Sequence, residues 1–204
     1  MSKLTEYIGS QFGNPRGIVG FICCKCMNII NKKMYRKTVS ILTLNNNQKL
    51  LDIGYGNGYL LKQADKKFGC ELYGIDISED MKVLAEKRNK KALEAKRLNL
   101  EVGDCCNLQF ADNTFDAVSS INTVYFWADT VKGLAEIRRC LISGGCFINA
   151  VYTKEWLSRT KMAEKGFKKF EPEELVQLGK QAGFEKIEVT EIVKGKSFAV
   201  VYWK

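Results

Sequence analysis

The sequence predicts an α/β fold: a doubly wound sheet of about seven strands, the last one antiparallel, with helices on both faces. Three observations support this prediction. From residue 49 onward, short apolar strand patterns alternate with amphipathic helix patterns. Glycines stand at alternate positions directly after the first strand. The final two strand patterns are separated only by residues 194–196, which fit a hairpin and are too few for a helical crossover.

The strand and helix patterns follow one another in a regular order. Ser78 is a good helix N-cap and is followed by two acids, as the first turn of a helix favours. Gly144 and Gly145 can end the helix that precedes them. The expected strands are 49–53, 70–77, 98–104, 114–121, 146–152, 185–193 and 195–204, and the expected helices are 58–68, 78–96, 129–141 and 171–184.

Two domains of unequal size are expected, an N-terminal helical extension over residues 1–45 and a core over residues 46–204. The apolar stretch 17–30 is interrupted by Lys25 and is too short to span a bilayer, so we interpret it as a lid helix over the ligand cleft. A membrane-surface helix is the alternative, because four cations follow in residues 31–37. Residues 153–169 are a second candidate lid.

Composition excludes several kinds of site. The 204 residues include no histidine, which rules out Ser-His and Cys-His catalysis and removes the commonest metal ligand. The polar N-terminus gives no secretory signal, so we expect a cytoplasmic protein whose eight cysteines are reduced thiols. Cys23, Cys24 and Cys26 form one cluster without a second, and we predict no metal site. We interpret the net charge of +9 as solvated helix faces, and we expect no nucleic acid partner.

The glycine loop indicates a nucleoside ligand. Ligands of such sheets bind beyond the carboxyl ends of the strands, and an acid at the end of the second strand, here Asp76, accepts hydrogen bonds from a ribose. The loop spacing is Gly-x-Gly-x-Gly, with Tyr59 where a dinucleotide fold would place its last glycine. Asp52 before the loop suits an ammonium and a sulfonium better than a pyrophosphate. S-adenosylmethionine is therefore favoured, with a nicotinamide dinucleotide as the alternative.

From residue 48 to residue 204 the chain resembles the class I S-adenosylmethionine-dependent methyltransferases, in particular the small-molecule branch called methyltransferase type 11. The resemblance implies a Rossmann-like fold, S-adenosyl-L-methionine as cofactor, and in-line transfer of a methyl group to a small-molecule acceptor. It rests on several motifs in order, namely LLDIGYGNG, YGIDISEDM, VGDCCNLQFADNTFDAV, NTVYFWAD, LAEIRRCLISGGCFI and EELVQLGKQAGFEKIEV.

The same resemblance implies a cofactor-binding set but no catalytic base. Asp76 would hold the ribose, Ile77 would pack on adenine, and Asp104 would accept from the adenine amino group. Plainer readings are helix–strand packing for Gly58 and a turn cap for Asp104. The remaining implied contacts fall into three groups. The loop residues Gly54, Tyr55, Gly56 and Gly58 would enclose the methionine part, with Asp52 nearby. The Cys105 backbone N–H would lie beside Asp104, and Asn122 would line the donor and substrate side.

Three other functions stay open from sequence. An RNA-methylating enzyme would carry an Asn-Pro-Pro-Tyr-type tetrad after the fourth strand, where this chain has Ile-Asn-Thr-Val at residues 121–124. An arsenite or thiol methyltransferase would use separated cysteines, unlike the cluster at residues 23–26. A non-catalytic donor-binding protein is the third. The acceptor, the methylated atom and the oligomeric state do not follow from the sequence.

Overall fold

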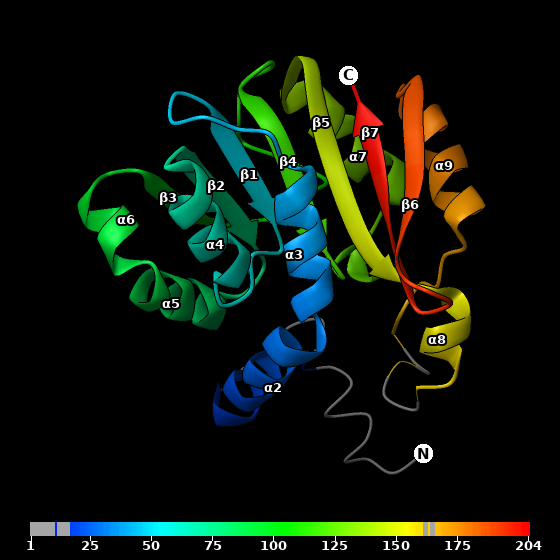
Figure 1. Cartoon of the computed structure of the whole chain (residues 1–204), viewed down its shortest axis with the longest axis horizontal. Coiled ribbons are helices and arrows are strands. Elements are labelled where there is room, and N and C mark those ends of the chain that lie inside the picture. The colour runs from blue at the N-terminus through cyan, green and yellow to red at the C-terminus, as the bar shows by residue number, and fades with distance from the viewer. Residues whose placement is uncertain (1–10, 12–16, 161–162, 164–165) are drawn as a thin grey trace.

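The computed structural model describes residues 11, 17–160, 163 and 166–204, and these contain a seven-stranded sheet in the order β3-β2-β1-β4-β5-β7-β6 (Figure 1). The first five strands run parallel, and β7 runs antiparallel to both β5 and β6. This confirms the predicted doubly wound sheet with an antiparallel final strand. The strands are β1 (Lys49–Ile53), β2 (Glu71–Asp76), β3 (Leu98–Val102), β4 (Phe115–Ile121), β5 (Leu141–Tyr152), β6 (Lys186–Val193) and β7 (Ser197–Trp203).

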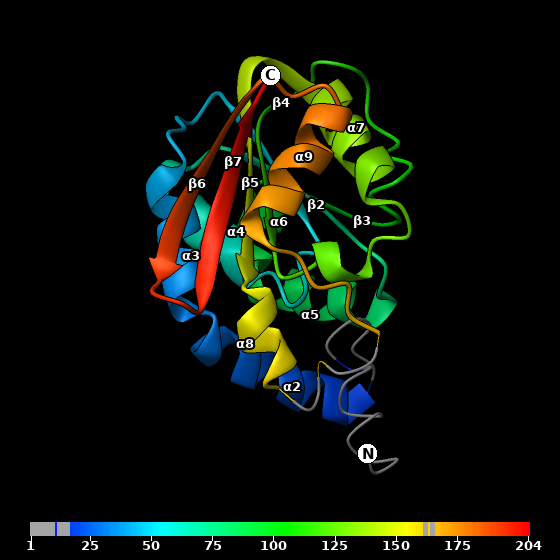
Figure 2. The ribbon, with the colours of Figure 1, turned by 90° about the vertical axis from the view of Figure 1, so that its right-hand side faces the viewer.

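Helices cover both faces of the sheet, as Figure 2 shows from the side. One core lies between the sheet and α3, α4 and α5, and the other lies between the sheet and α7 and α9. The helices are α2 (Gly17–Ile30), α3 (Lys32–Ile41), α4 (Tyr59–Phe68), α5 (Glu79–Arg88), α6 (Lys90–Glu94), α7 (Thr130–Cys140), α8 (Lys154–Ser158) and α9 (Pro172–Gln181), with a short 3-10 turn η1 (Val124–Phe126).

The strand order reverses between β1 and β4, which are neighbours although two strands separate them in the chain. The crevice at such a reversal is where open α/β sheets bind ligands. Helices α2 and α8 both lie at this end of the sheet, beyond the carboxyl end of β5 (Figure 1). The topology therefore brings an N-terminal helix and a late helix to the same opening.

Two predicted elements differ from the structure. The single helix expected over residues 78–96 is wrong, because it breaks at Asn89 into α5 and α6. The buried Asn89 side chain donates to the carbonyls of Ala85 and Gly58, so its amide competes with the helical backbone. The expected helix end at Gly144 and Gly145 is also wrong, because α7 ends at Cys140 and both glycines lie inside β5.

The N-terminal extension contributes two consecutive helices. Residues 12–16, which precede the expected lid helix in the sequence, lie outside the described residues. Helix α3 packs on the sheet through buried Met34, Thr38 and Val39, whereas α2 reaches past the sheet toward the crevice. Within the described part of the chain, no helix is long and apolar enough to cross a lipid bilayer.

Candidate functional site

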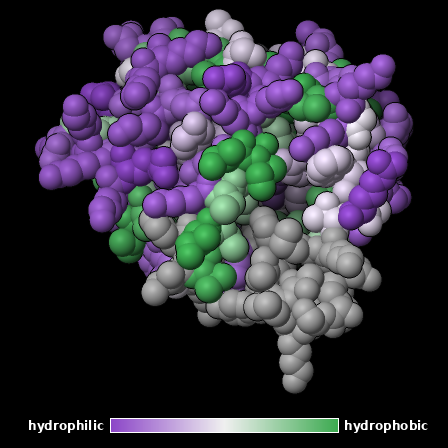
Figure 3. All heavy atoms as spheres, turned by 60° about the horizontal axis from the view of Figure 1, so that its bottom comes forward, coloured by the Kyte–Doolittle hydropathy of each residue, from purple (hydrophilic) through white to green (hydrophobic). Residues whose placement is uncertain are grey.

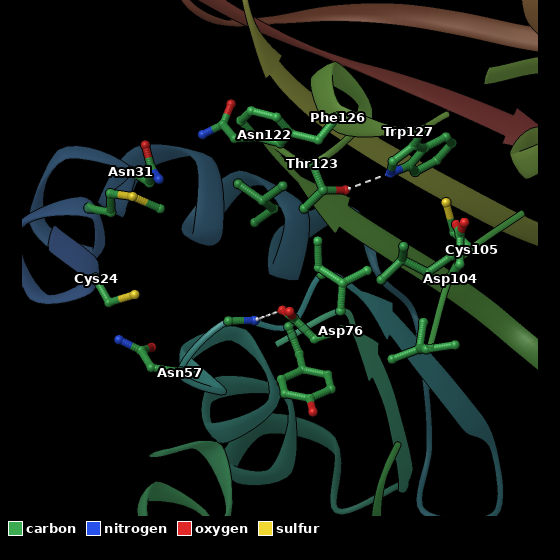
Figure 4. Close-up of a pocket in the computed structure, with 18 of the residues that line it drawn as sticks. Cys24, Asn31, Asn57, Asp76, Asp104, Cys105, Asn122, Thr123, Phe126 and Trp127 are labelled. Atoms are coloured by element: carbon green, nitrogen blue, oxygen red, sulfur yellow. Dashed lines mark hydrogen bonds between the residues drawn. The ribbon is translucent and has the colours of Figure 1, made fainter. Parts of the chain in front are cut away.

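A cavity of about 260 Å³ lies at the carboxyl ends of β1, β2 and β4 (Figure 4). The glycine loop forms one wall, and the segment after β4 forms the opposite wall. Helix α2 and the start of α3 close a third side. Of the ten predicted cofactor-binding residues, eight line it: Gly54, Tyr55, Gly56, Asp76, Ile77, Asp104, Cys105 and Asn122.

The glycine loop needs glycine for two different reasons. Gly54 has φ +68°, and a Cβ there would come within 2.2 Å of the Thr123 side chain, so this glycine lets the loop approach the β4 end. Gly56 has φ +51°, and a Cβ there would meet no atom within 4 Å, so its open side faces the cavity. Gly58 lies outside the cavity wall, and a Cβ would come within 2.4 Å of Asn89 Nδ2. Its role is to pack α4 against α5.

Asp76 ends β2 and holds the loop in place. One carboxylate oxygen accepts from the Gly56 N–H at 2.8 Å, and the other accepts from the Ser78 N–H at 3.0 Å. Burial raises the pKa of this carboxyl, and the backbone hydrogen bonds oppose the shift. Because each carboxylate oxygen has a further lone pair, the group can still accept from a ligand hydroxyl. The next residue, Ile77, is 53% exposed although it is a large apolar side chain, as an open platform for a flat ring requires.

Asp52 lies behind the cavity rather than in its wall. Its side chain is buried and accepts a hydrogen bond of 2.8 Å from the Ser119 hydroxyl. Burial raises the pKa of this carboxyl to about 7, and the Ser119 bond opposes that shift. Asp52 can therefore act on a ligand through its charge but not by contact.

Asp104 stands at the far end of the cavity beside two buried thiols. Its carboxylate accepts from the Cys106 N–H at 2.9 Å, so it caps a turn as well as lining the cavity. Among the described residues, Asp104, Cys105 and Cys106 bring three possible metal-ligand atoms within 4.8 Å of one another. The Cys106 thiol donates to the Asp129 carbonyl at 3.2 Å, and burial raises the pKa of Cys105, which disfavours the thiolate that metals bind. The donor set therefore fits packed thiols better than a metal.

Asn122 follows β4 with φ +60°, an uncommon backbone for a residue other than glycine. Its side-chain oxygen accepts from the Tyr125 hydroxyl at 3.0 Å, and that hydroxyl accepts from the Tyr152 N–H at 2.6 Å. Burial raises the pKa of Tyr125, so its hydroxyl stays protonated and is no general base. The network fixes Asn122 at the inner end of the cavity, where Figure 4 shows it across from Asn31.

A second cavity of about 220 Å³ adjoins the first on the side of α2 and α8. Four residues line both cavities: Met27, Asn31, Asn122 and Phe126. The others lining the second cavity are Ile30, Tyr125, Tyr152, Trp156, Leu157, Thr160, Ala163 and Phe167. Two compartments thus meet at a pair of asparagines.

Comparison with known proteins gives the family. A protein-family model described as a methyltransferase domain matches residues 51–149. A Bacillus subtilis (strain 168) protein named "Uncharacterized methyltransferase YdaC" is 31% identical over 173 residues, which cover 84% of this chain and 88% of that protein. The chain belongs to the class I S-adenosylmethionine-dependent methyltransferases. Its cofactor is S-adenosyl-L-methionine.

Other relatives match less of their own length. The methyltransferase is 28% identical over 146 residues to phosphoethanolamine N-methyltransferase 2 of Caenorhabditis elegans, covering 69% of this chain and 33% of that protein. It is 32% identical over 117 residues to a demethylmenaquinone methyltransferase of Bacteroides fragilis, covering 57% and 48%. The chain therefore spans half or less of these two relatives.

Solved structures agree with the methyltransferase fold. A structure described as the "Complex between the Haloferax volcanii Trm112 methyltransferase activator and the putative methyltransferase" superimposes with a TM-score of 0.79 at 22% identity, covering 88% of this chain and 92% of that one. Haemonchus contortus phosphoethanolamine N-methyltransferase 2 in complex with S-adenosyl-L-methionine gives a TM-score of 0.71 at 21% identity, covering 85% and 52%.

The sequence predicted a lid helix over the cleft but not which of its residues line the methyltransferase site. Cys24, Met27 and Asn28 of α2, with Asn31 and Tyr35 after it, line the first cavity. Their spacing of three to four residues is that of one helix face, and two asparagines interrupting an apolar helix were the available signal. Among the described residues, the cysteines of α2 do not gather three ligand atoms at one point, which argues against the arsenite alternative.

Proposed function

We propose that this methyltransferase transfers the methyl group of S-adenosyl-L-methionine to a small-molecule acceptor held in the second cavity. One observation carries the proposal: the two cavities share a wall at Asn31 and Asn122. A donor methyl at that wall would face an acceptor on the other side. The names of the Caenorhabditis elegans and Bacteroides fragilis relatives, which refer to phosphoethanolamine and demethylmenaquinone, support a small-molecule acceptor.

The donor would lie along the first cavity with its ends at opposite walls. The backbone of Gly54, Tyr55 and Gly56 would enclose the methionine part, near the charge of Asp52. Asp76 would accept from the ribose hydroxyls, and Ile77 would cover one face of the adenine. Asp104 and the Cys105 backbone N–H would meet the adenine edge, and Asn122 would border the methyl group.

Transfer would be an in-line displacement at the methyl carbon. The sulfonium is already an activated leaving group, so the chain's own residues need to align the acceptor and exclude water rather than supply a strong base. This agrees with a chain that has no histidine and with a Tyr125 hydroxyl that stays protonated.

The N-terminal extension over residues 1–45 would form part of the acceptor side, beside a core over residues 46–204. In support, α2 supplies side chains to both cavities. The eight cysteines are free thiols, which supports a reducing, cytoplasmic setting.

Asp76→Asn tests the donor assignment. A hydrogen bond to a charged group contributes about 1.5–3 kcal/mol, so we expect the Kd for S-adenosyl-L-methionine to rise about tenfold to hundredfold. Calorimetric titration of the purified protein measures it. Thermal unfolding without donor is recorded in parallel, because Asp76 also accepts from the Gly56 and Ser78 N–H groups.

Asp112→Asn is the matched control. Asp112 is an exposed carboxylate that pairs with Arg139 at 2.7 Å and does not line either cavity. Its donor Kd should stay within about twofold of the unaltered protein, a change of less than about 0.5 kcal/mol. An unchanged Kd for a folded Asp76→Asn protein would contradict the proposed ribose contact.

A further inference from the structure

We propose that the acceptor is an amine on a small apolar body, bound uncharged in the second cavity with its nitrogen at Asn31 and Asn122. The inference rests on the proposed function and specifies its substrate class. It follows from the chemistry of the cavity wall, from the groups at the shared boundary, and from the way burial acts on different nucleophiles.

The wall of the second cavity is apolar. None of the described residues that line it carries a formal charge. Its side-chain polar atoms are largely occupied, since the Tyr152 hydroxyl donates to Asn31 Oδ1 at 2.6 Å and the Thr160 hydroxyl donates to the Trp156 carbonyl at 3.1 Å. The wall also includes Asn122 and Tyr125, and its apolar remainder is Met27, Ile30, Phe126, Leu157, Ala163, Phe167 and the ring of Trp156.

An acceptor with a phosphate or carboxylate would lose its hydration here without gaining a counter-charge from any described residue of the wall. Among the lysines that the structure describes, Lys168 and Lys196 come near the wall but do not line it. Lys168 Nζ donates to the carbonyls of Trp127 and Ala128 at 2.6 and 2.9 Å. Lys196 Nζ lies 4.2 Å from the ring centroid of Trp156, a cation–π contact. The described residues of this wall therefore favour an acceptor with an apolar body, which loses no hydrogen bonds when it leaves water.

Size limits the acceptor further. The cavity measures about 220 Å³. Small-molecule sites are typically roughly 300–1,000 Å³. One ring with a short linker fills this space, so a larger acceptor would extend out of the cavity.

Burial selects between nucleophiles because it disfavours whichever form is charged. A buried thiol or phenol is held in its neutral, weakly nucleophilic form and would need a base. The residues lining the second cavity include no histidine and no carboxylate among those the structure describes. A buried amine is held in its neutral form, which is the nucleophile. The same apolar wall therefore activates an amine and deactivates a thiol.

The transfer balances without a base in the cavity. The amine lone pair forms the new N–C bond while the C–S bond breaks and its electron pair stays on sulfur. The sulfonium becomes a neutral thioether, the nitrogen becomes an ammonium, and the ammonium loses its proton to water after release. The amide oxygens of Asn31 and Asn122 each accept one tyrosine hydroxyl and keep a second lone pair, which can accept from the N–H groups as positive charge develops.

The cavity opens beside an apolar surface. Ile30 and Trp156 line it and are 56% and 38% exposed, so they mark its rim between α2 and α8. Figure 3 shows apolar residues gathered at this end of the molecule, with hydrophilic residues on one side of them. An apolar molecule can thus reach the cavity along a surface of matching chemistry.

A three-member acceptor panel tests the inference. Methyl transfer from S-adenosyl-L-methionine to 2-phenylethylamine, 2-phenylethanethiol and phosphoethanolamine is followed by mass spectrometry of the methylated products. We expect kcat/KM for 2-phenylethylamine to exceed that for the thiol at least tenfold, and phosphoethanolamine to give no product. Equal or faster transfer to the thiol, transfer to phosphoethanolamine, or no transfer to the amine by protein that binds the donor would overturn the inference. Loss of calorimetric donor binding would instead refute the proposed function.

Two neighbouring residues of α2 provide matched variants. Ile30→Asp puts a carboxylate at the cavity rim, and Ile29→Asp puts the same charge at a position that is 76% exposed and does not line the cavity. Both positions are exposed enough for the proteins to fold. We expect at least a tenfold fall in kcat/KM for 2-phenylethylamine in the first variant, because the carboxylate favours the unreactive ammonium form, and less than a twofold change in the second, with donor Kd unchanged in both. Equal effects of the two variants would contradict the assignment of the second cavity as the acceptor site.

Discussion

The first cavity, which we propose holds the donor (the donor cavity), and the second, which we propose holds the acceptor (the acceptor cavity), share a wall but are built in different ways. The donor cavity is formed largely by loops at the ends of neighbouring strands, contains the carboxylates Asp76 and Asp104, and requires left-handed backbone at Gly54 and Gly56. The acceptor cavity is formed mainly by α2, α8 and the residues around η1, and its wall is apolar. A site in which the backbone approaches the ligand needs glycines at fixed positions, which are visible in the sequence. A site lined by packed side chains needs no such fixed pattern.

The largest effect on stability is expected at Gly58, the glycine of the loop that packs against α5 and does not line the donor cavity. Gly58→Ala places a Cβ within 2.4 Å of Asn89 Nδ2 at φ +70°. Left-handed strain of about 1–2 kcal/mol and overpacking of about 1–3 kcal/mol should together lower the free energy of unfolding. Chemical denaturation measures the loss.

Gly56→Ala is the counterpart on the cavity side. Its Cβ meets no atom within 4 Å, so only the strain of about 1–2 kcal/mol should appear in the unfolding free energy. Its donor Kd should rise about tenfold, because the methyl group occupies donor space, a change of about 1.4 kcal/mol. If Gly58→Ala weakened donor binding more than Gly56→Ala in folded protein, the division of the loop into scaffold and site would be wrong.

This division also explains what the sequence could predict. Asp76 and the glycine loop were predictable because strand ends and glycine spacing fix backbone position, and the strand order then brings them together. The positions of Asp52 and Gly58 were harder to predict from the sequence. They lie behind the wall of the donor cavity because Asp52 packs against Ser119 and Gly58 packs against Asn89.

The sequence predicted two candidate lids over the cleft but not which of their residues line it, for a physical reason. Which face of α2 turns toward the cleft depends on how α2 and α3 dock, since the pattern of α2 is apolar nearly all round. Asn31 acquires its role from a distant part of the chain, since it accepts a hydrogen bond from Tyr152, 121 positions later. The break at Asn89 has a similar origin, in a bond to Gly58 across 31 positions.

Tyr125→Phe should affect the acceptor side and leave the donor side intact. The change removes the hydroxyl that accepts from the Tyr152 N–H and donates to Asn122 Oδ1. A buried N–H left without a partner costs about 1–3 kcal/mol, and a released Asn122 should raise the acceptor KM. Thermal unfolding and methyl-transfer kinetics measure the two effects.

Tyr73→Phe is the control for that change. The Tyr73 hydroxyl makes one exposed hydrogen bond of 3.3 Å to Glu71, so its removal should alter stability by less than about 0.5 kcal/mol. A weaker donor Kd in Tyr125→Phe, with acceptor KM unchanged, would reverse the assignment of this network to the acceptor side.

The smallest expected effect is a pH dependence confined to the donor side. Burial raises the pKa of Asp52 to about 7 from its ordinary 3.8, whereas it raises that of Tyr152 in the acceptor cavity to about 12. A carboxyl with a raised pKa destabilises the fold when it ionises, so its cost is absent below about pH 4, grows as pH rises, and is complete above about pH 7. A cationic donor favours the ionised form, so donor binding should tighten between pH 6 and pH 8, by at most about tenfold.

Asp52→Asn isolates this effect. Asparagine can keep the hydrogen bond from Ser119 but has no charge, so calorimetric donor binding should become nearly independent of pH, and stability should no longer fall as pH rises toward 7. A remaining slope would belong to Asp76, whose carboxyl pKa is also raised by burial. If the variant kept the full pH dependence, Asp52 would be a structural residue of β1, and the donor side would owe its polarity to Asp76 and Asp104.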